Sequence, residues 1–365
     1  MASAPPDPAL DPAPRPLRLA TYNVEWFNAL FDDEGRMLAD SARSARHGVS
    51  RGEQLGALGI VFSALDADGI LVIEAPDQSR RRSTARALEG FARHFELRAS
   101  RALIGFESET EQEIAFLYDP GRITARHDPQ GADPLHADPR DIPRFDGVFW
   151  HDLNADAQPE RVRFSKPPLE LALTACGHAL RLIGVHAKSK APHGARSPAE
   201  AIRIGIENRR KQLAQCLWLR QRVVRHLEAG ETLIVAGDFN DGPGLDEYEK
   251  LFGQSGVEIV MGMQGDASLR MREPHAELAL QSRVGLTAST ARFWLDSEKR
   301  YFEALLDFIL VSPDLATTRP RWRIWHPLND PVCWRAPELR EALLAASDHF
   351  PVTIDLWAGE AGHDA

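Results

Sequence analysis

The sequence predicts a mixed-sheet α/β protein, and three observations support that prediction. The chain has 365 residues, which is long enough to bury a sizeable core. Short apolar runs typical of buried strands recur along the sequence, and only a few helical patterns separate them. Strict alternation of strands and helices would favour a doubly wound parallel sheet. Because several strands here follow one another through loops, a mixed sheet is favoured.

Each predicted strand is a short apolar or alternating run that ends at a turn or a proline. The runs are 17–24, 69–75, 113–120, 164–173, 179–188, 233–236, 304–311 and 349–356. Helical patterns cover 53–65 and 83–95, and a long amphipathic, basic pattern covers 199–229. Proline, aspartate and glycine are dense between residues 128 and 141, which predicts a surface loop there. One domain from 17 to 357 is the simplest division of the chain.

The two ends of the chain differ from this domain in composition. Residues 1–16 are rich in proline, alanine and aspartate and predict a disordered tail, as do residues 358–365. The first residues have neither the basic nor the apolar region of a secretory signal, so we expect a cytoplasmic protein. No apolar run approaches the roughly 20 residues of a transmembrane helix. Cys176, Cys216 and Cys333 form an odd set without CxxC spacing, which predicts reduced thiols.

Charge is distributed unevenly along the chain. The formal net charge of -10 argues against a protein that simply coats nucleic acid. Basic clusters nevertheless follow predicted strands: Arg43, Arg46 and Arg51; Arg80, Arg81 and Arg82; and Lys188 and Lys190. If these clusters surround one site, they would hold a polyanion by its phosphates. Solvated loops are the alternative explanation.

Polar side chains stand at the ends of the predicted strands. They are Asn23, Glu74, His186, Asp238, Asn240, Asp307, Asp348 and His349. The segment LIVAGDFNDGPG, which also contains Asp241, would be explained by turn chemistry alone. Asp307 is harder to dismiss, because a carboxylate inside an apolar strand costs several kcal/mol, roughly, unless it finds a partner. So many polar groups at so many strand ends predict one shared site.

Such a set suits metal-assisted attack on a phosphate ester. Mg²⁺ takes one or two protein carboxylates, and Glu74 is the natural ligand. His349 is suited to activate a water as general base, and Asp307 to hold its other ring nitrogen. Asp238 would steer a proton near the nucleophile or the leaving group. Asn23, Asn240 and His186 could donate hydrogen bonds to phosphoryl oxygens.

In order, the segments TYNV, VIEAPD, FSKPP, GVHAKSK, GDFND, LLDFILVS and SDHFPV resemble the endonuclease/exonuclease/phosphatase superfamily, the group of DNase I and exonuclease III. The resemblance runs from about residue 17 to 356. It implies a four-layer α/β/β/α sandwich with two packed mixed sheets and the site at one edge. Two departures stand out: Ile73-Glu74 replaces the usual Gln-Glu pair, and the arginine typical of inositol-polyphosphate 5-phosphatases is missing after GDFND.

The resemblance also implies a role at each matching position. Asn23, Glu74 and Asp348 lie near the metal; Asp238 and Asn240 lie at the phosphate and the nucleophile; Asp307 pairs with His349; and Lys166 contacts a phosphate. His186 matches the second histidine of the group, with Glu113 or Glu111 as its acidic partner. The placement of Lys188 predicts a further phosphate contact.

The resulting functional hypothesis is a Mg²⁺-dependent phosphodiesterase that hydrolyses nucleic acid, DNA in preference to RNA, as a DNase I-like endonuclease. Mn²⁺ or Ca²⁺ could substitute or assist. A lipid or inositol-phosphate phosphoesterase resembling the sphingomyelinases is the alternative, supported by a loop with Trp322, Trp325 and Trp334. A binding protein without catalysis is the third reading, disfavoured because every chemical role is filled.

Overall fold

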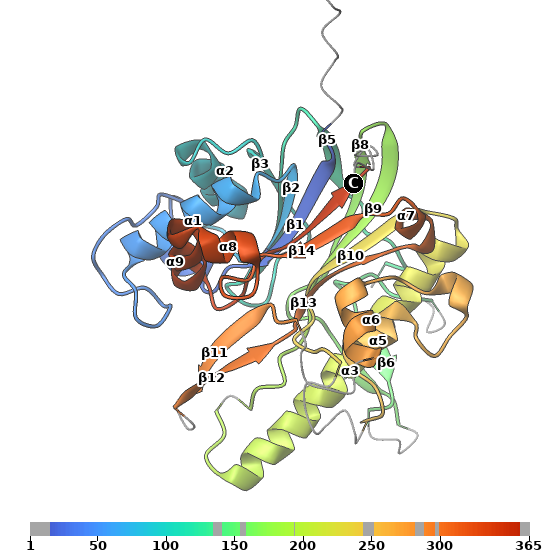
Figure 1. Cartoon of the computed structure of the whole chain (residues 1–365). Helices are drawn as coiled ribbons and strands as arrows, with labels where there is room; N and C mark the ends of the chain where they lie inside the picture. Colours follow the sequence, from blue (N-terminus) through green and yellow to red (C-terminus); the bar gives the residue numbers. More distant parts are fainter. Residues whose placement is uncertain are drawn as a thin grey trace, which may run out of the picture.

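Two mixed β-sheets form the centre of the computed structural model (Figure 1), which describes residues 15–133, 141–153, 158–192, 194–243, 252–281, 288–295 and 299–357. The first sheet has the strand order β14-β15-β1-β2-β4-β3 and the second the order β13-β10-β9-β8-β5. Strands β1 and β2 are parallel, as are β9 and β10, whereas β15, β4, β8 and β13 pair antiparallel with their neighbours. The predicted mixed direction is confirmed.

The strand bounds of the two sheets are as follows. The first sheet contains β1 (Leu17–Asn23), β2 (Gly69–Ala75), β3 (Arg101–Ile104), β4 (Glu113–Tyr118), β14 (Arg321–Ile324) and β15 (Val352–Leu356). The second contains β5 (Ile123–His127), β8 (Leu169–Ala175), β9 (His178–His186), β10 (Leu233–Asp238) and β13 (Asp307–Val311). Two small hairpins lie outside them: β6 (Phe149–His151) with β7 (Glu160–Val162), and β11 (Ala291–Leu295) with β12 (Arg300–Ala304).

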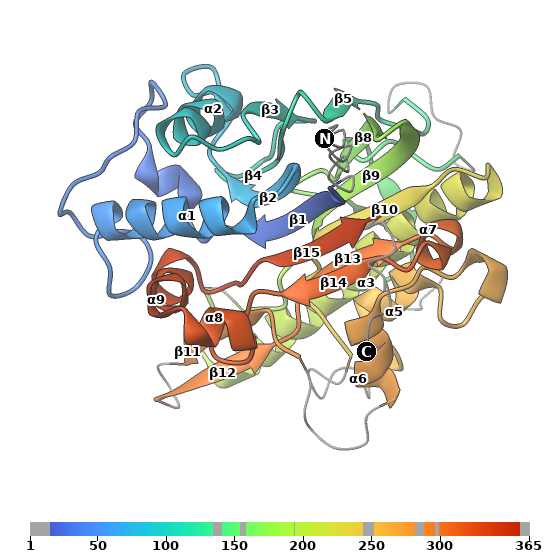
Figure 2. The same cartoon turned by 45° about the horizontal axis from the view of Figure 1, so that its top comes forward.

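Helices cover the outer faces of both sheets (Figures 1 and 2). On the side of the first sheet lie α1 (Arg51–Leu65), α2 (Thr84–His94), α8 (Pro331–Arg335) and α9 (Pro337–Ala346). On the side of the second lie α3 (Pro198–Glu228), α5 (Gly256–Met261) and α6 (Pro274–Gln281). The short α7 (Pro313–Thr317) and the 3₁₀ helices η1 (Phe27–Leu30) and η2 (Ala267–Leu269) complete the described elements.

Alternation along the strands produces this layering. In β2, Leu71 and Ile73 belong to the core between the sheets, while Ile70 and Val72 belong to the core under α1 and α2. In β10, the neighbours Ile234 and Val235 divide in the same way between the inter-sheet core and the core under α3. Successive strand residues point to opposite faces, so both sheets are buried on both sides. The four-layer α/β/β/α sandwich follows, as predicted.

Most predicted elements are present, and proline explains two of the shifted boundaries. The strand predicted from 164 begins at Leu169, after Pro167 and Pro168, and the last strand begins at Val352, after Pro351. Proline has no amide hydrogen for a strand ladder. The strand predicted over 304–311 divides into the end of β12 and β13. The short strands β3, β5 and β14, which lack long apolar runs, were not predicted.

Several predictions concern the ends and the bulk of the chain. Residues 1–14 and 358–365 of the predicted tails, and 134–140 of the predicted loop, lie outside the described residues. Arg15, within the predicted N-terminal tail, forms an ion pair with Asp66 at 3.2 Å. The three cysteines are free thiols, as predicted. Within the described ranges, no helix combines the length and the apolar character needed to cross a bilayer.

Candidate active site

The predicted site residues meet because parallel strands end at the same edge. Asn23 ends β1 beside Ile73 of β2, and Glu74 follows directly. In the other sheet, Asp238 at the end of β10 lies between His186 of β9 and Asp307 of β13 in the strand register. The edge where both sheets end therefore gathers acids, amides and imidazoles from segments far apart in sequence.

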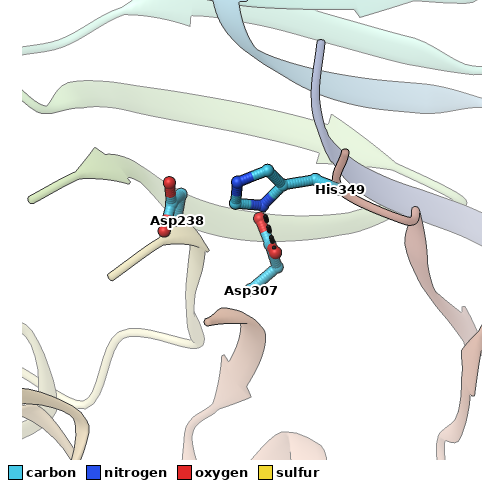
Figure 3. Close-up of side chains that lie close together, drawn as sticks. All are labelled: Asp238, Asp307 and His349. Carbon is cyan, nitrogen blue, oxygen red and sulfur yellow. Dashed lines mark hydrogen bonds and ion pairs between the residues drawn. The ribbon is translucent and has the colours of Figure 1, made fainter. Parts of the chain in front are cut away.

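His349 and Asp307 form a buried hydrogen-bonded pair. Their Nδ1 and Oδ2 atoms are 2.7 Å apart, and the imidazole lies between Asp307 and Asp238 (Figure 3). Figure 3 also shows the second ring nitrogen turned toward the side of Asp238. Asp307 Oδ1 has no hydrogen-bond partner among the described residues. The hydrogen bond at Nδ1 fixes which ring nitrogen is free to exchange a proton.

The loop before β15 holds His349 rigidly. Its backbone N–H donates to Ser347 Oγ at 3.1 Å, and Ser347 Oγ in turn donates to the carbonyl of Asn23 at 2.8 Å. Phe293 of β11 packs edge-to-face on the imidazole, with ring centroids 5.5 Å apart. The end of β1, the hairpin and the loop therefore position one histidine together.

Asp238 is the most extensively bound acid of the site. Its Oδ1 accepts the backbone N–H of Asn240 at 2.7 Å, and its Oδ2 accepts the amide hydrogens of Asn23 at 3.0 Å and Asn240 at 3.2 Å. Gly237, directly before it, has φ 135°, and a Cβ there would lie 2.0 Å from the carbonyl oxygen of Val185. Only glycine fits this close approach of β9 and β10, which aims Asp238 at the edge.

Burial and neighbouring charges shift the proton affinities of this group in one direction. Burial, followed by the charge of Asp307, raises the pKa of Asp238 to about 7, although His349 opposes the shift. The pKa of His349 rises well above its ordinary value because Asp307, Asp238 and Asp348 outweigh the effect of burial. Both groups therefore retain protons more strongly than they would in water.

His186 is buried in a different electrostatic environment. Its Nε2 lies 3.2 Å from Lys166 Nζ and 3.7 Å from Asp238 Oδ2. Burial, and then the charges of Lys166 and His349, lower its pKa well below the ordinary value. A neutral His186 that accepts from the Lys166 ammonium agrees with this geometry. The acidic partner predicted for His186 is wrong: Glu113 accepts from the backbone of Ser108 and Gln78, and Glu111 from Asn28.

Lys166 links the two sheets of the site. Burial lowers its pKa, and the carboxylates of Glu74 and Asp238 oppose that effect. An ammonium group between these acids and beside His186 is well placed to meet an anionic ligand. The structure thus brings the predicted phosphate-contacting lysine to the predicted edge.

Glu74 has a strained backbone conformation. Its φ of 60° lies in the left-handed region, and the register of β2 and β4 is interrupted there by a bulge. The backbone N–H of Trp26 donates to Glu74 Oε2 at 3.2 Å. Burial raises the pKa of Glu74, and Asp348 adds to the rise. Such local strain persists where surrounding structure enforces it, as at ligand sites.

The donor set around Glu74 fits a divalent cation. Asn23 Oδ1 is buried and has no hydrogen-bond partner in the described part of the chain, because the amide nitrogen of that side chain faces Asp238. Asp348 is close enough to Glu74 for their charges to interact. The unpartnered amide oxygen of Asn23 and the carboxylates of Glu74 and Asp348 are oxygen donors of the kind that hard divalent cations take. A second group of possible ligands consists of Asp238, Asp307 and His349, whose ligand atoms lie within 4.8 Å of one another.

Glu25 is a site residue that the sequence did not reveal. Burial, then repulsion from Asp348, raises its pKa to about 7, and Glu74 adds to the rise. Arg46 binds the Glu25 carboxylate and also donates to the carbonyl of Leu344 at 2.7 Å. Glu25 directly follows the TYNV segment, so its closeness to Asn23 in the sequence was the only available signal.

Several arginines that were predicted to surround the site with free positive charge are paired with acids instead. Arg46 binds Glu25, and Arg82 Nε donates to Asp33 at 2.7 Å. Arg51 Nε donates to Asp40 at 2.9 Å. The prediction is therefore wrong for these three side chains. Acids that the fold brings close neutralise them, and for Arg46 and Arg82 these acids come from distant parts of the sequence.

The GDFND segment contains one acid with a structural role. Asp241 is fully buried, and its Oδ1 accepts from Lys190 at 2.9 Å while its Oδ2 binds Arg209 of α3. Asn240 has φ 51°, a left-handed conformation that asparagine tolerates, and its amide also donates to the carbonyl of Ala187 at 3.1 Å. Both amide hydrogens of Asn240 are thus used within the protein. The side chain therefore has no amide hydrogen left for the phosphate contact that was predicted for it.

The tryptophans that supported a lipid substrate do not form an exposed loop. Trp325 is buried, and Trp322 donates its indole N–H to the carbonyl of Ile309 at 2.8 Å. Trp334 alone of the three is strongly exposed, and Arg340 stacks on its ring at 4.9 Å from the centroid. The predicted membrane-facing cluster is therefore wrong.

Comparison with known proteins agrees with this geometry. The model of the Endonuclease/Exonuclease/phosphatase family matches residues 20–349, and no curated protein matches the chain. Among solved structures, Caenorhabditis elegans TDP2 has 12% sequence identity and a TM-score of 0.50, covering 94% of this chain and 75% of that chain. A mannosyl-6-phosphatase from Bacteroides thetaiotaomicron has 13% identity and a TM-score of 0.48, covering 93% of this chain and 99% of that chain. At 12% identity, the likeness to TDP2 shows the fold alone.

Proposed function

The chain belongs to the endonuclease/exonuclease/phosphatase family, and from this premise we propose that it is a divalent-metal-dependent phosphodiesterase of nucleic acid. The observation that supports the proposal best is the buried His349–Asp307 pair, 2.7 Å apart, beside Asp238. A base, an acid and metal-type oxygen donors meet at one sheet edge, as hydrolysis of a phosphodiester requires. DNA is the expected substrate in preference to RNA.

Glu74, Asp348 and the free Oδ1 of Asn23 would hold the cation, and Mg²⁺ is the ion that this oxygen set suits. When bound, the cation supplies positive charge that polarises a phosphoryl oxygen and offsets part of the negative charge around His349. The strained backbone of Glu74 and its contact with the Trp26 N–H keep that carboxylate in place.

His349 acts as the general base in this proposal. Its Nδ1 is held by Asp307, so its Nε2 is the atom that takes a proton from the attacking water. Asp307 then stabilises the imidazolium that forms, as do the charges of Asp238 and Asp348. The raised pKa of His349 makes its neutral form a strong base.

Asp238 serves the leaving group. With a pKa of about 7, its carboxyl group is partly protonated at neutral pH and can give a proton to the departing oxygen. Asn23 and Asn240 hold the carboxylate in place through their amide hydrogens. Lys166 neutralises charge on a phosphoryl oxygen, and His186 positions Lys166 through the 3.2 Å contact between their nitrogens.

The first experiment is cleavage of supercoiled plasmid by the purified protein with Mg²⁺. We expect nicked and then linear product, loss of activity with EDTA, and loss of activity in His349→Ala and Asp238→Asn. Sphingomyelin, a phosphoinositide and a sugar phosphate are tested in parallel. Turnover of one of these with intact plasmid would refute the nucleic-acid assignment while leaving the family assignment in place.

A further inference from the structure

A basic groove opens next to the active site, between β7 and α3. It has a volume of about 630 Å³ and is lined by Glu109, Arg161, Val162, Arg163, Ser165, Lys188, Lys211 and Gln215. Ser165 directly precedes Lys166, and Lys188 follows His186 by two residues, so the groove begins where the site ends. The proposed chemistry assigns no role to the basic side chains of this groove, Arg161, Arg163, Lys188 and Lys211.

The walls of the groove are held by one buried glutamine. Gln215 of α3 accepts the backbone N–H of Lys188 at 2.8 Å and donates to the carbonyl of Arg163 at 2.9 Å. It therefore ties the segment after β9 to the segment before Lys166. A fixed spacing between the two walls keeps the cations at fixed positions, which is the arrangement of a preorganised binding surface.

Positive charge in the groove is largely uncompensated. Arg163 approaches Glu109 at 3.8 Å, but both side chains are more than half exposed, so the pair is worth little. Within the described ranges, neither Lys188 nor Lys211 has an acid within ion-pair distance. Burial and then the charge of Lys211 lower the pKa of Lys188, and Lys188 in turn contributes to the lowered pKa of Lys166. Three ammonium groups thus follow one another outward from the site.

An exposed aromatic ring flanks the same groove. Trp150 of β6 is 56% exposed, and the guanidinium of its cross-strand neighbour Arg161 lies 6.0 Å from the ring centroid. An exposed tryptophan beside a row of cations is typical of surfaces on which unpaired bases stack while the backbone follows the charges. A free phosphate or a small phosphate ester would need only one of these cations.

We propose that this groove binds the sugar-phosphate backbone of a single-stranded nucleic acid that extends from the scissile phosphate past Lys188 toward Lys211 and Arg161, with a base stacked on Trp150. The inference rests on the proposed function and makes it more specific: the preferred substrate is a strand of several nucleotides with a single-stranded segment on this side of the cleavage point.

The test compares Arg161→Gln/Lys211→Gln with Arg93→Gln/Arg321→Gln, a control with the same charge change at exposed arginines of α2 and β14. The readout is kcat/KM for a single-stranded oligonucleotide of about twenty nucleotides divided by kcat/KM for bis(p-nitrophenyl) phosphate. In the groove variant we expect this ratio to fall about tenfold or more. The slope of log affinity against log salt should become shallower by roughly 1.4, which is about 0.7 per lost phosphate contact. In the control variant both quantities should stay near wild type.

Trp150→Ala tests the base contact separately. Affinity is measured by fluorescence anisotropy of the labelled oligonucleotide in EDTA, where no turnover occurs. We expect about a five- to hundredfold weaker affinity for the single strand and little change for blunt duplex.

The outcomes separate this inference from the proposed function. The inference is overturned if the groove variant and the control variant show the same kcat/KM ratio and the same salt slope. It is also overturned if Trp150→Ala weakens binding of blunt duplex as much as binding of the single strand. If wild-type protein hydrolyses neither diester, the proposed function fails. The anisotropy measurement then still decides whether the groove binds single strands.

Discussion

His349 and His186 are both buried in one site, His349 just before β15 of the first sheet and His186 at the end of β9 of the second. Their surroundings nevertheless shift their pKa values in opposite directions. Acids surround His349 and raise its pKa well above the ordinary value. Lys166 stands beside His186, whose pKa falls well below it. Burial alone would lower the pKa of both. The charges of the neighbours, rather than depth, therefore separate the proton affinities of the two histidines. This difference supports our proposal that His349 carries the proton and that a neutral His186 positions Lys166.

The same difference in neighbouring charge separates two sides of the site. Acidic side chains concentrate at Asp238, Asp307, Asp348 and Glu74, where we propose that a proton is transferred and a cation binds. Positive charge starts at Lys166 and continues into the groove of Lys188 and Lys211. A phosphodiester placed across this boundary would have its reacting atoms on the acidic side and the next phosphates of the chain on the basic side.

Removal of a proton-transferring group on the acidic side should have the largest effect. His349→Ala and Asp238→Asn are each expected to lower kcat by about 10²–10⁴, because each takes away one acid–base partner. Plasmid nicking and hydrolysis of a small diester measure the loss. His178→Ala, at the other end of β9 where the ring stacks on Trp357, is the control and should stay near wild type. Equal activity of His349→Ala and the control would contradict the proposed division between an acidic, proton-transferring side and a basic, phosphate-binding side.

Asp307→Asn should have the next largest effect, and it also moves the pH profile. Asp307 raises the pKa of His349 by its charge and its hydrogen bond. Without that charge the pKa falls, so neutral His349 persists to lower pH and the acidic limb of kcat/KM shifts to lower pH. The plateau should drop at least about a hundredfold, because the imidazolium loses its partner. An acidic limb that stays in place or moves to higher pH would show that another group controls it.

How far the sequence predicts this site depends on which physical signal each residue leaves. Asp307, Asp238 and His349 follow or interrupt apolar strands, and strand direction then places them together, so pattern and resemblance were sufficient. Asp238 and Asp241 are two acids of one turn, however, and only the packing of Arg209 from α3 distinguishes the structural acid from the site acid. Sequence spacing contains no information on that long-range contact.

The fold shows the same limit. Short apolar or alternating runs predicted the central strands of both sheets, since burial on both faces leaves a nearly continuous apolar pattern. A long amphipathic pattern predicted the helix α3. Edge strands such as β3 and β14 are half exposed and read as loops. The free charge predicted for Arg46 and Arg82 was wrong because Glu25 and Asp33 reach them only in three dimensions. Ion pairing across loops cannot be counted from composition.

Lys166→Gln should reduce the pKa difference between the two histidines and cause a smaller loss of activity than the preceding variants. Loss of a charge-assisted hydrogen bond to a phosphoryl oxygen should lower kcat/KM about 10–100-fold. The Lys166 charge also lowers the pKa of His186, so its removal should raise that pKa while that of His349 changes little. Titration of the two imidazoles by NMR measures both. A rise confined to His349 would reverse the assignment of the two environments.

Asp241→Asn should leave activity nearly unchanged while it weakens the fold, and so separates the two acids of the GDFND turn. Asp241 is buried against Arg209 and Lys190, and loss of its charge strands a buried guanidinium. The free energy of unfolding should fall by about 3–5 kcal/mol in a denaturant titration. At a temperature where the variant is folded, kcat should fall less than about threefold, because Asn240 still holds Asp238 through its backbone N–H at 2.7 Å. If kcat instead fell as far as in Asp238→Asn with little loss of stability, Asp241 would belong to the reacting side of the boundary.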